Sequence, residues 1–495
     1  MYQLRKYQTK SIEDMSVNYR KGLRKLLLVA PTGSGKTVVA SEVMRRVVAG
    51  GKQCLFIAHR RELIMQCSRK LYDFGVSHGI LMAGKSPTKH AAVQVASIQT
   101  LTARKDKHDF DLPPADLIIL DEAHRSVSTS FQELIDLYPD TYIVGLTATP
   151  CRSDGRGLGD VYQKIIECSN IKELTDNKFL VPSRIIAPTL PDLKGIKITA
   201  GDYDAKMLNK RMNVPKLVGD LVEHWNLYAN DRPTVVFATS IAHSKYIANI
   251  FRQNGIPAGH IDGEMKETER EKQLEMLESG DIKVLSNCQV LTEGWDCPKV
   301  SCVILARPTK SYGLYLQMVG RSLRPYKNKK DSLIIDHSGA VYEHGFPDEP
   351  PTWSLQAKKR DNRKPNKPRD IEKQPYTCVE CNHVYKPTKN EPECPMCLHV
   401  PTKKEKAVLI KQGRLIEVTK KEKVEPEHKK HFYGQVLYYA RQKGYNDGWA
   451  SWIFKDKYKH FPANKQVTPI SPSKDVLNYI KHYNIKKAKA MEANK

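Results

Sequence analysis

The stretch KLLLVAPTGSGKT, residues 25–37, decides the fold. Its opening run KLLLVA is short and apolar, which predicts a strand that is buried on both faces. Gly33 and Gly35 follow, and they let backbone amides turn inward around phosphate oxygens without a Cβ clash. The residues after them predict a helix whose positive dipole end would face those phosphates. The stretch therefore predicts a strand, a phosphate-binding loop and a helix in succession.

Four side chains of this loop are candidates for binding a nucleotide and Mg²⁺. Lys36 would reach the terminal phosphates, and Thr37 would place its hydroxyl on Mg²⁺. Thr32 and Ser34 belong to the same predicted loop. The strict pattern begins with Gly, where this chain has Ala30. The alternative is a flexible glycine-rich turn in a protein without a nucleotide, which the preceding strand and the GKT ending disfavour.

An acidic motif at a second strand end fits the same chemistry. DEAH, residues 121–124, directly follows the apolar run DLIIL, so its first carboxylates would project toward the phosphate loop. Asp121 would hold Mg²⁺ through its water shell, and Glu122 would orient and deprotonate the attacking water. The alternative for a lone DEAH tetrapeptide is a helix cap.

Apolar runs of strand length recur and predict two α/β domains, each built on a buried parallel sheet. In the first half they end at residues 30, 58, 120 and 146; later they cover residues 234–238, 283–286, 300–306 and 332–336, with a helix expected over about 266–278. We expect the domains at residues 1–180 and 181–350. A Pro- and Lys-rich linker (351–373), a four-cysteine module (374–402), a charged linker (403–430) and a basic aromatic module (431–495) would follow.

The charge of the chain is strongly positive and uneven. Eighty Lys and Arg against 55 Asp and Glu give +25, of which residues 351–495 carry +17. This balance favours a polyanionic partner such as nucleic acid, although a basic tail can also be a solvated face. An anionic membrane surface is the weaker alternative, and no apolar run approaches the length of a spanning helix. We therefore expect no membrane association.

The cysteines indicate a reducing compartment and a metal site. Eleven cysteines occur, and the start MYQLRKYQTK lacks the apolar region of a signal peptide, so we expect a cytoplasmic protein without disulfides. Four of them form two CxxC pairs separated by twelve residues: Cys378, Cys381, Cys394 and Cys397. This spacing predicts one structural Zn²⁺ with a closed tetrahedral shell. A redox CxxC pair is the alternative.

Seven further motifs follow one another in a fixed order. They are LRKYQ (4–8), AHRREL (58–63), ASIQTL (96–101), TAT (147–149), VFATS (236–240), LTEGWDCP (291–298) and QMVGRSLRP (317–325). Together with the phosphate loop and DEAH, they resemble the motifs of superfamily 2 helicases, which commonly carry A-x-T-G-x-G-K-T. The resemblance implies two tandem RecA-like domains of the P-loop NTPase type.

The resemblance also implies roles for individual residues. Gln8 would read adenine, and Gly294 and Asp296 would lie at the nucleotide, with Asp296 at the ribose. Strand contacts would come from Arg60, Ser97, Thr100, Thr239, Ser240 and Thr292. Gln317, Arg321 and Arg324 would complete catalysis from the second lobe, and we expect both arginines on one helix face. Surface salt bridging is the alternative for these arginines.

The C-terminal part of the chain indicates which helicases the sequence resembles most specifically. Ten aromatic residues interleave with basic ones over residues 432–461, and we expect most of them to form the module's own core rather than a stacking platform for bases. A two-lobe motor with such a tail and a four-cysteine module looks like the bacterial RadD helicases and related phage-encoded DNA helicases. That implies roles in DNA repair, recombination or replication.

The sequence thus predicts a monomeric ATP-dependent helicase or translocase that uses ATP, Mg²⁺ and Zn²⁺. Its partner would be DNA, with branched or forked DNA favoured and single-strand-binding or recombination proteins as further partners. Four alternatives stay open: an RNA helicase, a duplex translocase that does not separate strands, the motor subunit of a restriction nuclease, and a DNA-binding accessory protein timed by ATP. The expected contacts are mainly to the sugar-phosphate backbone, so sequence does not separate DNA from RNA.

Overall fold

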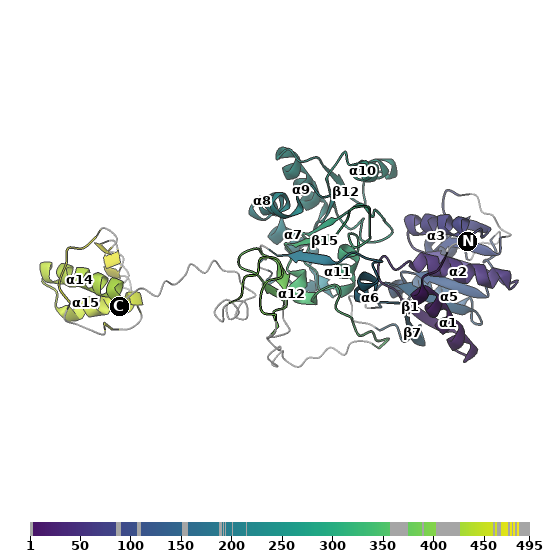
Figure 1. Cartoon of the computed structure of the whole chain (residues 1–495), viewed down its shortest axis with the longest axis horizontal. Coiled ribbons are helices and arrows are strands. Elements are labelled where there is room, and N and C mark those ends of the chain that lie inside the picture. The colour runs from purple at the N-terminus through teal and green to yellow at the C-terminus, as the bar shows by residue number, and fades with distance from the viewer. Residues whose placement is uncertain are drawn as a thin grey trace. The chain divides into compact units, whose positions relative to one another are not determined.

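The computed structural model describes residues 3–85, 91–105, 110–150, 157–187, 191, 193, 195–199, 201–213, 215–356, 375–388, 391–401, 426–458, 461–462, 467–473, 476–477, 479–480 and 483–484. The chain forms two compact units, residues 1–414 and 415–495 (Figure 1). The predicted linkers 351–373 and 403–430 lie largely outside the described residues. Among the described residues, no helix is both long and apolar enough to cross a membrane.

The first lobe is a seven-stranded parallel sheet with the order β3-β4-β2-β5-β6-β1-β7. Its strands are β1 (Lys25–Val29), β2 (Cys54–Ala58), β3 (His78–Leu81), β4 (Val93–Ser97), β5 (Leu117–Asp121), β6 (Tyr142–Thr147) and β7 (Lys164–Glu167). Its helices are α1 (Lys6–Arg20), α2 (Lys36–Ala49), α3 (Arg61–Asp73), α4 (Ile98–Arg104) and α5 (Thr129–Asp136), with a 3₁₀ turn, η1, at Ala123–Arg125.

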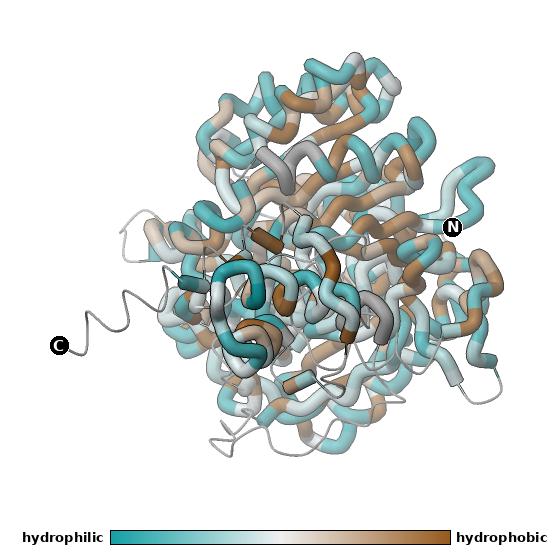
Figure 2. Tube along the Cα trace, turned by 90° about the vertical axis from the view of Figure 1, so that its left-hand side faces the viewer, coloured by the Kyte–Doolittle hydropathy of each residue, from teal (hydrophilic) through white to brown (hydrophobic). Residues whose placement is uncertain are grey.

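Side chains of β1 show why this sheet is buried on both faces. Leu26 and Leu28 pack in the same apolar cluster as residues of α1, α2 and α3, whereas Leu27 and Val29 pack with residues of α4 and α5. Successive strand residues point to opposite faces, so a continuous apolar run fills two helix layers at once. In Figure 2, brown apolar stretches are frequent in the interior of the trace, and teal hydrophilic stretches cover many of its outer turns.

The second lobe is a six-stranded parallel sheet with the order β12-β13-β11-β14-β15-β8. Its strands are β8 (Ser183–Ile186), β11 (Thr234–Phe237), β12 (Ala258–Ile261), β13 (Val284–Asn287), β14 (Cys302–Leu305) and β15 (Ser332–Asp336). One face packs with α10 (Glu267–Ser279), α11 (Tyr312–Val319) and α12 (Ala340–His344), and the other with α8 (Pro215–His224), the π-helical turn Trp225–Ala229 and α9 (Ile241–Gln253).

Smaller elements connect and extend the lobes. Helix α6 (Ile171–Asp176) lies between β7 and β8, and the hairpin of β9 (Ile198–Thr199) and β10 (Asp202–Tyr203) precedes α7 (Ala205–Met212). The four-cysteine module holds the hairpin of β16 (Tyr376–Thr377) and β17 (Val384–Tyr385). It is joined to the edge strand of the second lobe by a bridge between Ile186 and His383.

The unit of residues 415–495 has its own core between α14 (Pro426–Gln442) and α15 (Asp447–Tyr458). Phe432, Tyr433 and Phe454 are buried in this core, and Tyr439 and Trp449 pack against it. Four further aromatic side chains are exposed: Tyr438, Tyr445, Trp452 and Phe461. The expectation that most of these aromatic residues serve the core is therefore confirmed for five of the described side chains.

The fold class predicted from the apolar runs is confirmed: two tandem parallel α/β domains carry a four-cysteine cluster and a helical aromatic unit. Each of the eight apolar runs corresponds to a strand, and the helix expected over about 266–278 is α10. Strands β3, β4, β7, β8 and β12 were not anticipated, because they are short or carry polar residues among the apolar ones.

We predict that the absence of a side chain at Gly145 is important for the stability of the first lobe. Gly145 lies on β6, and a Cβ at this position would overlap the hydroxyl and ring of Tyr162, which is fully buried. Gly145→Ala should destabilise the first lobe by about 2 kcal/mol through overpacking. Thermal unfolding monitored by circular dichroism checks this, with Gly263→Ala as the control because nothing lies within 4 Å of its added Cβ. Equal unfolding temperatures for both variants would contradict the prediction.

Candidate nucleotide site between the lobes

The phosphate loop joins β1 to α2, which begins at Lys36. Gly33 and Gly35 have φ angles of +86° and +84°, in the left-handed region that favours glycine. An added Cβ at Gly33 would lie 2.9 Å from the Leu180 side chain, and one at Gly35 would lie 2.6 Å from Gln8 Nε2. The two glycines therefore serve both the turn and its close packing.

The Gln8 side chain is hydrogen-bonded to the backbone of the phosphate loop. Its Nε2 donates a hydrogen bond to the Ser34 carbonyl at 2.9 Å, and its Oε1 accepts one from the Arg5 amide at 3.0 Å. The Tyr7 hydroxyl donates to the same Ser34 carbonyl at 2.8 Å. The structure thus places Gln8 and Ser34 together at the back of the loop, and the adenine role of Gln8 stays a prediction.

A cavity of about 320 Å³ opens in front of the loop and is lined by both lobes. It brings together twelve of the residues predicted for the nucleotide: Thr32, Gly33, Gly35, Lys36, Thr37, Asp121, Glu122, Gly294, Asp296, Gln317, Arg321 and Arg324. Sequence analysis missed Arg5 and Phe179 in this lining, where the Arg5 guanidinium lies 4.1 Å from the centre of the Phe179 ring. A flat cation and a ring at the cavity rim suit an aromatic base.

The two DEAH carboxylates meet the lysine inside this cavity. Glu122 Oε1 lies 3.5 Å from Lys36 Nζ, and Asp121 Oδ1 accepts a hydrogen bond from the Glu122 amide at 3.0 Å. Burial, with the charge of Glu122, raises the pKa of Asp121 to about 6. Burial also raises the pKa of Glu122, but the charges of Lys36, His124 and Arg321 outweigh it, so this pKa lies below its ordinary value.

The geometry favours a catalytic pair over a helix cap. Glu122 precedes the 3₁₀ turn η1 with φ +49°, and its side chain makes no capping hydrogen bond. Its buried Oε2 accepts no hydrogen bond from the described residues, and His124 Nδ1 lies 3.4 Å from it. An ionised carboxylate with an unused acceptor beside a lysine fits a base that receives a proton from water. The carboxylate of Asp121, with Thr37 in the same lining, fits an Mg²⁺ shell.

The expectation that Arg321 and Arg324 share a helix face is wrong. Helix α11 ends at Val319, and both arginines lie in the turn that follows. Gly320 is the C-cap of α11 and lets the chain approach Thr32, whose Cβ would lie 2.8 Å from an added Cβ, and Pro325 disfavours a helical conformation for Arg324. Both guanidinium groups still reach the cavity.

Each arginine has partners within the second lobe. Arg321 donates hydrogen bonds to the Trp295 carbonyl and, at 2.7 Å, to the Thr292 carbonyl. Arg324 pairs with the Asp296 carboxylate. Burial lowers the pKa of each arginine to about 10, so both remain cations at neutral pH. Both arginines are thus half-buried cations held at the cavity by groups of their own lobe, and one of those contacts is the salt bridge of Arg324 with Asp296.

The residues predicted to contact a strand are spread over both lobes. Ser97 donates to Gln99 Oε1 at 2.6 Å, and Thr100 is buried on α4. Thr239 and Ser240 both donate to Asn209 Oδ1, at 3.4 and 2.6 Å, and Ser240 also caps α9. Thr292 donates to the Gln289 carbonyl at 3.3 Å. Their strand contacts stay predictions.

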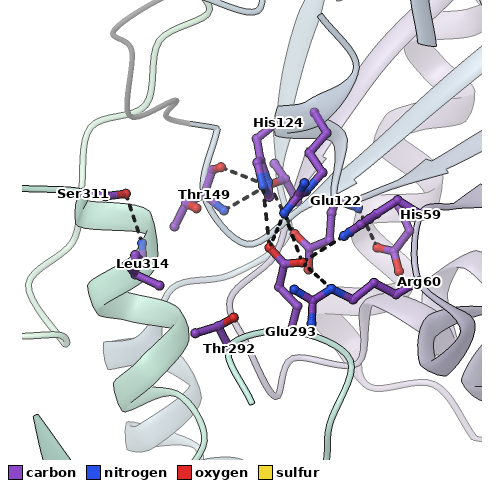
Figure 3. Close-up of polar contacts among 12 residues, drawn as sticks. His59, Arg60, Glu122, His124, Thr149, Thr292, Glu293, Ser311 and Leu314 are labelled. Atoms are coloured by element: carbon purple, nitrogen blue, oxygen red, sulfur yellow. Dashed lines mark hydrogen bonds and ion pairs between the residues drawn. The ribbon is translucent and has the colours of Figure 1, made fainter. Parts of the chain in front are cut away.

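Sequence analysis missed the carboxylate of Glu293, which lies close to Arg60 at the lobe interface (Figure 3). Neighbouring residues line a second cavity, of about 860 Å³, to which both lobes contribute: His59, Gln99, Thr102, His124, Arg125, Thr149, Glu293, Ser311 and Gln317 are among them. Among the described residues, none of the six predicted strand contacts lines this cavity. The sequence LTEGWDCP does not by itself indicate a role for Glu293, because the partners of this side chain lie in the other lobe.

The four predicted zinc ligands converge on one point. The sulfur atoms of Cys378, Cys381, Cys394 and Cys397 all lie within 4.8 Å of one another. The closest approaches join the two CxxC pairs, with 3.5 Å from Cys378 to Cys397 and 3.6 Å from Cys381 to Cys394.

The two halves of this cluster have matching turns. The amides of Asn382 and Leu398 donate to the carbonyls of Cys378 and Cys394, and both residues have positive φ. The His399 amide lowers the pKa of the Cys397 thiol to about 7, whereas burial raises the pKa of the Cys378 and Cys381 thiols. Four convergent sulfurs fit tetrahedral Zn²⁺ better than a single redox pair.

Comparisons with known proteins agree with this geometry. Residues 1–152 match the family described as type III restriction enzyme, res subunit, and residues 214–326 match the helicase conserved C-terminal domain. A 51.5 kDa protein of Lactococcus phage (isolate 7-9) is 31% identical over 399 residues, covering 80% of this chain and 83% of that protein.

Two further proteins each match 68% of the chain. A Saccharomyces cerevisiae protein, provisionally named ATP-dependent helicase IRC3, is 31% identical over 358 residues, which cover 68% of this chain and 52% of that protein. The chain thus spans about half the length of the yeast relative. The ATP-dependent type ISP restriction-modification enzyme LlaBIII bound to DNA has the same fold over 68% of this chain and 28% of that chain, with a TM-score of 0.53 and 18% identity.

The first lobe matches the restriction-enzyme res subunit family, the second lobe matches the helicase conserved C-terminal domain, and the phage relative is 31% identical over 80% of the chain. The candidate nucleotide cavity is lined by residues of the phosphate loop, by Asp121 and Glu122, and by Arg321 and Arg324. The chain belongs to the superfamily 2 helicases.

Proposed function

We propose that this helicase hydrolyses ATP to move on or unwind DNA, with branched or forked DNA as its preferred substrate. The observation that carries the proposal is the cavity in which Lys36 and Glu122 of the first lobe face Arg321 and Arg324 of the second. A site divided between two lobes can turn over only when they close on the nucleotide, and closure moves one lobe relative to the other. That movement is how ATP turnover would pull a strand.

The residues of the cavity divide the work of phosphoryl transfer. Lys36 would bind the terminal phosphates, and Thr37 and Asp121 would hold Mg²⁺, which when bound neutralises phosphate charge. Glu122 would take a proton from the attacking water. Arg321 and Arg324 would stabilise the charge that develops on the transferred phosphoryl group. In the present structure these arginines are held by Thr292, Trp295 and Asp296, so nucleotide binding would have to exchange those partners.

Three features favour DNA. The tail is strongly basic, a structural relative was solved bound to DNA, and the four-cysteine module with the aromatic unit is similar to the RadD helicases. From that resemblance we propose a role in repair, recombination or replication, in the cytoplasm, for a protein that acts as a monomer. RNA unwinding, duplex translocation without strand separation and ATP-timed DNA attachment are alternatives that one set of assays distinguishes.

Replacing Lys36 by Ala or Glu122 by Gln should abolish strand-stimulated ATP turnover. The general base alone should contribute about a hundredfold or more. Turnover and strand displacement are measured side by side on single-stranded, duplex, forked and RNA substrates at one salt concentration. The matched control is Lys52→Ala, because Lys52 is an exposed lysine that pairs with Asp116 outside the cavity.

The variants should still bind strands, because neither residue is predicted to contact one. Persistent ATP turnover in both variants would contradict the assignment. If only RNA stimulated ATP turnover, the proposed substrate would be RNA instead of DNA. If DNA stimulated ATP turnover but no strand was displaced on any substrate, the result would favour duplex translocation or ATP-timed DNA attachment.

We also propose that the four cysteines bind one structural Zn²⁺. Cys381→Ser should lose the metal, measured as zinc per chain by mass spectrometry, and Cys288→Ser should keep it because Cys288 is a free cysteine of the second lobe. Because β17 contacts β8 and Val384 packs in the second-lobe core, metal loss should also lower the unfolding temperature of this lobe. Native protein purified without chelators and free of zinc would contradict the site.

A further inference from the structure

Glu293 is a buried carboxylate of the second lobe that lies among basic groups of the first. It follows β13 in the loop that carries Thr292, and its side chain is only 6% exposed. Burying a single carboxylate without partners is costly, so the groups around it determine whether it keeps its charge. Among the described residues, the four basic side chains within 4.0 Å of its carboxylate come from the first lobe, and the charge of Arg321 in the second lobe also interacts with it (Figure 3).

Two of these neighbours stand directly after β2, in the segment predicted to contact a strand. His59 Nε2 lies 3.0 Å from Glu293 Oε2, and Arg60 Nε lies 3.3 Å from the same oxygen. Arg60 also donates to the Val290 carbonyl at 3.2 Å, so its guanidinium is held entirely by the second lobe in this arrangement. A phosphate that approached Arg60 would have to compete with these partners.

The other two neighbours stand directly after the catalytic carboxylates. Arg125 Nη2 lies 3.3 Å from Glu293 Oε1, and His124 Nε2 lies 4.0 Å from that oxygen. The opposite ring nitrogen of His124 lies 3.4 Å from Glu122 Oε2. His124 is thus placed between two carboxylates, one from each lobe, and its ring connects Glu293 to the base that would activate water.

Glu293 is ionised, and its single negative charge is smaller than the combined positive charge of Arg60 and Arg125. Burial raises its pKa, but contacts with His59, Arg125 and Arg60 outweigh burial and hold the pKa far below its ordinary value. Two arginines surround this one carboxylate, which leaves excess positive charge beside the cavity lined by both lobes. Strand phosphates carry the same charge as Glu293 and bind arginine by the same contacts.

We propose that Glu293 is a positioning residue that makes ATP turnover depend on the strand. Without a strand its carboxylate occupies Arg60 and Arg125 and, through His124, sets the position of Glu122. A backbone phosphate that takes over either arginine releases Glu293, and His124 and Glu122 then adjust together. The inference rests on the proposed function, because it assumes a strand that stimulates ATP turnover.

The test compares Glu293→Gln with Glu293→Asp in the full-length protein. The probe is a single-stranded oligodeoxythymidylate, and its Kd and the ratio of stimulated to unstimulated ATP turnover are measured for each variant. Without the competing charge, Glu293→Gln should bind the probe about fivefold more tightly, and its stimulation ratio should fall about fivefold or more. Glu293→Asp keeps the charge and should restore the ratio at least in part.

Glu267→Gln is the matched control. Glu267 pairs with Arg61 across the same lobe interface at 3.1 Å, but the pair is exposed and touches neither His124 nor Glu122. This variant should behave as the wild type in both measurements. Tighter binding together with weaker stimulation is a split that general destabilisation does not produce.

Three results would overturn the inference: Glu293→Gln equal to the wild type, equal effects of Glu293→Gln and Glu267→Gln, or weaker probe binding with a lowered unfolding temperature. In each of these the wild type is still stimulated, so the proposed function stands. If neither DNA nor RNA stimulates ATP turnover by the wild type, the proposed function and this inference both fail.

Discussion

The buried pair of Lys36 and Glu122 is the interaction on which the site depends. The two residues follow β1 and β5, which are separated in the sheet only by β6, and their charged atoms lie 3.5 Å apart. The charge of Lys36 helps to keep the buried Glu122 carboxylate ionised, whereas removal of the lysine would leave that charge without its partner. The parallel sheet makes this possible because its functional loops emerge at one edge.

The second lobe supplies what this pair lacks. Arg321 and Arg324 add positive charge on the other side of the cavity, and Glu293 holds basic groups that flank the acidic motif. The lobes are therefore joined at their interface by charged contacts as well as by the small apolar cluster of Leu174, Leu180 and Leu323. Charged contacts can exchange partners with phosphates, which gives nucleotide and strand a way to act on the same interface.

Features encoded by one continuous stretch of sequence, such as a strand or a cysteine motif, were predicted correctly. Contacts between segments that are distant in sequence were missed. The apolar run before Ala30 determined a strand, and the cysteine spacing determined a four-sulfur cluster, because each pattern is local. The helix predicted for Arg321 and Arg324 was wrong because α11 ends at Val319 with Gly320 as its C-cap, although the glycine was visible in the sequence. Glu293 was not identified, because its significance lies in first-lobe partners more than 160 residues away in sequence.

The most direct test of a divided site is the turnover of Arg321→Ala. If Arg321 stabilises the transferred phosphoryl group, strand-stimulated kcat should fall about a hundredfold while the affinity for nucleotide changes little. Arg321→Lys, which keeps a charge but not the two-pronged donor, should recover only part of the rate. An Arg321→Ala enzyme that turns over ATP at the wild-type rate would contradict the account, because the first lobe would then be a complete catalyst by itself.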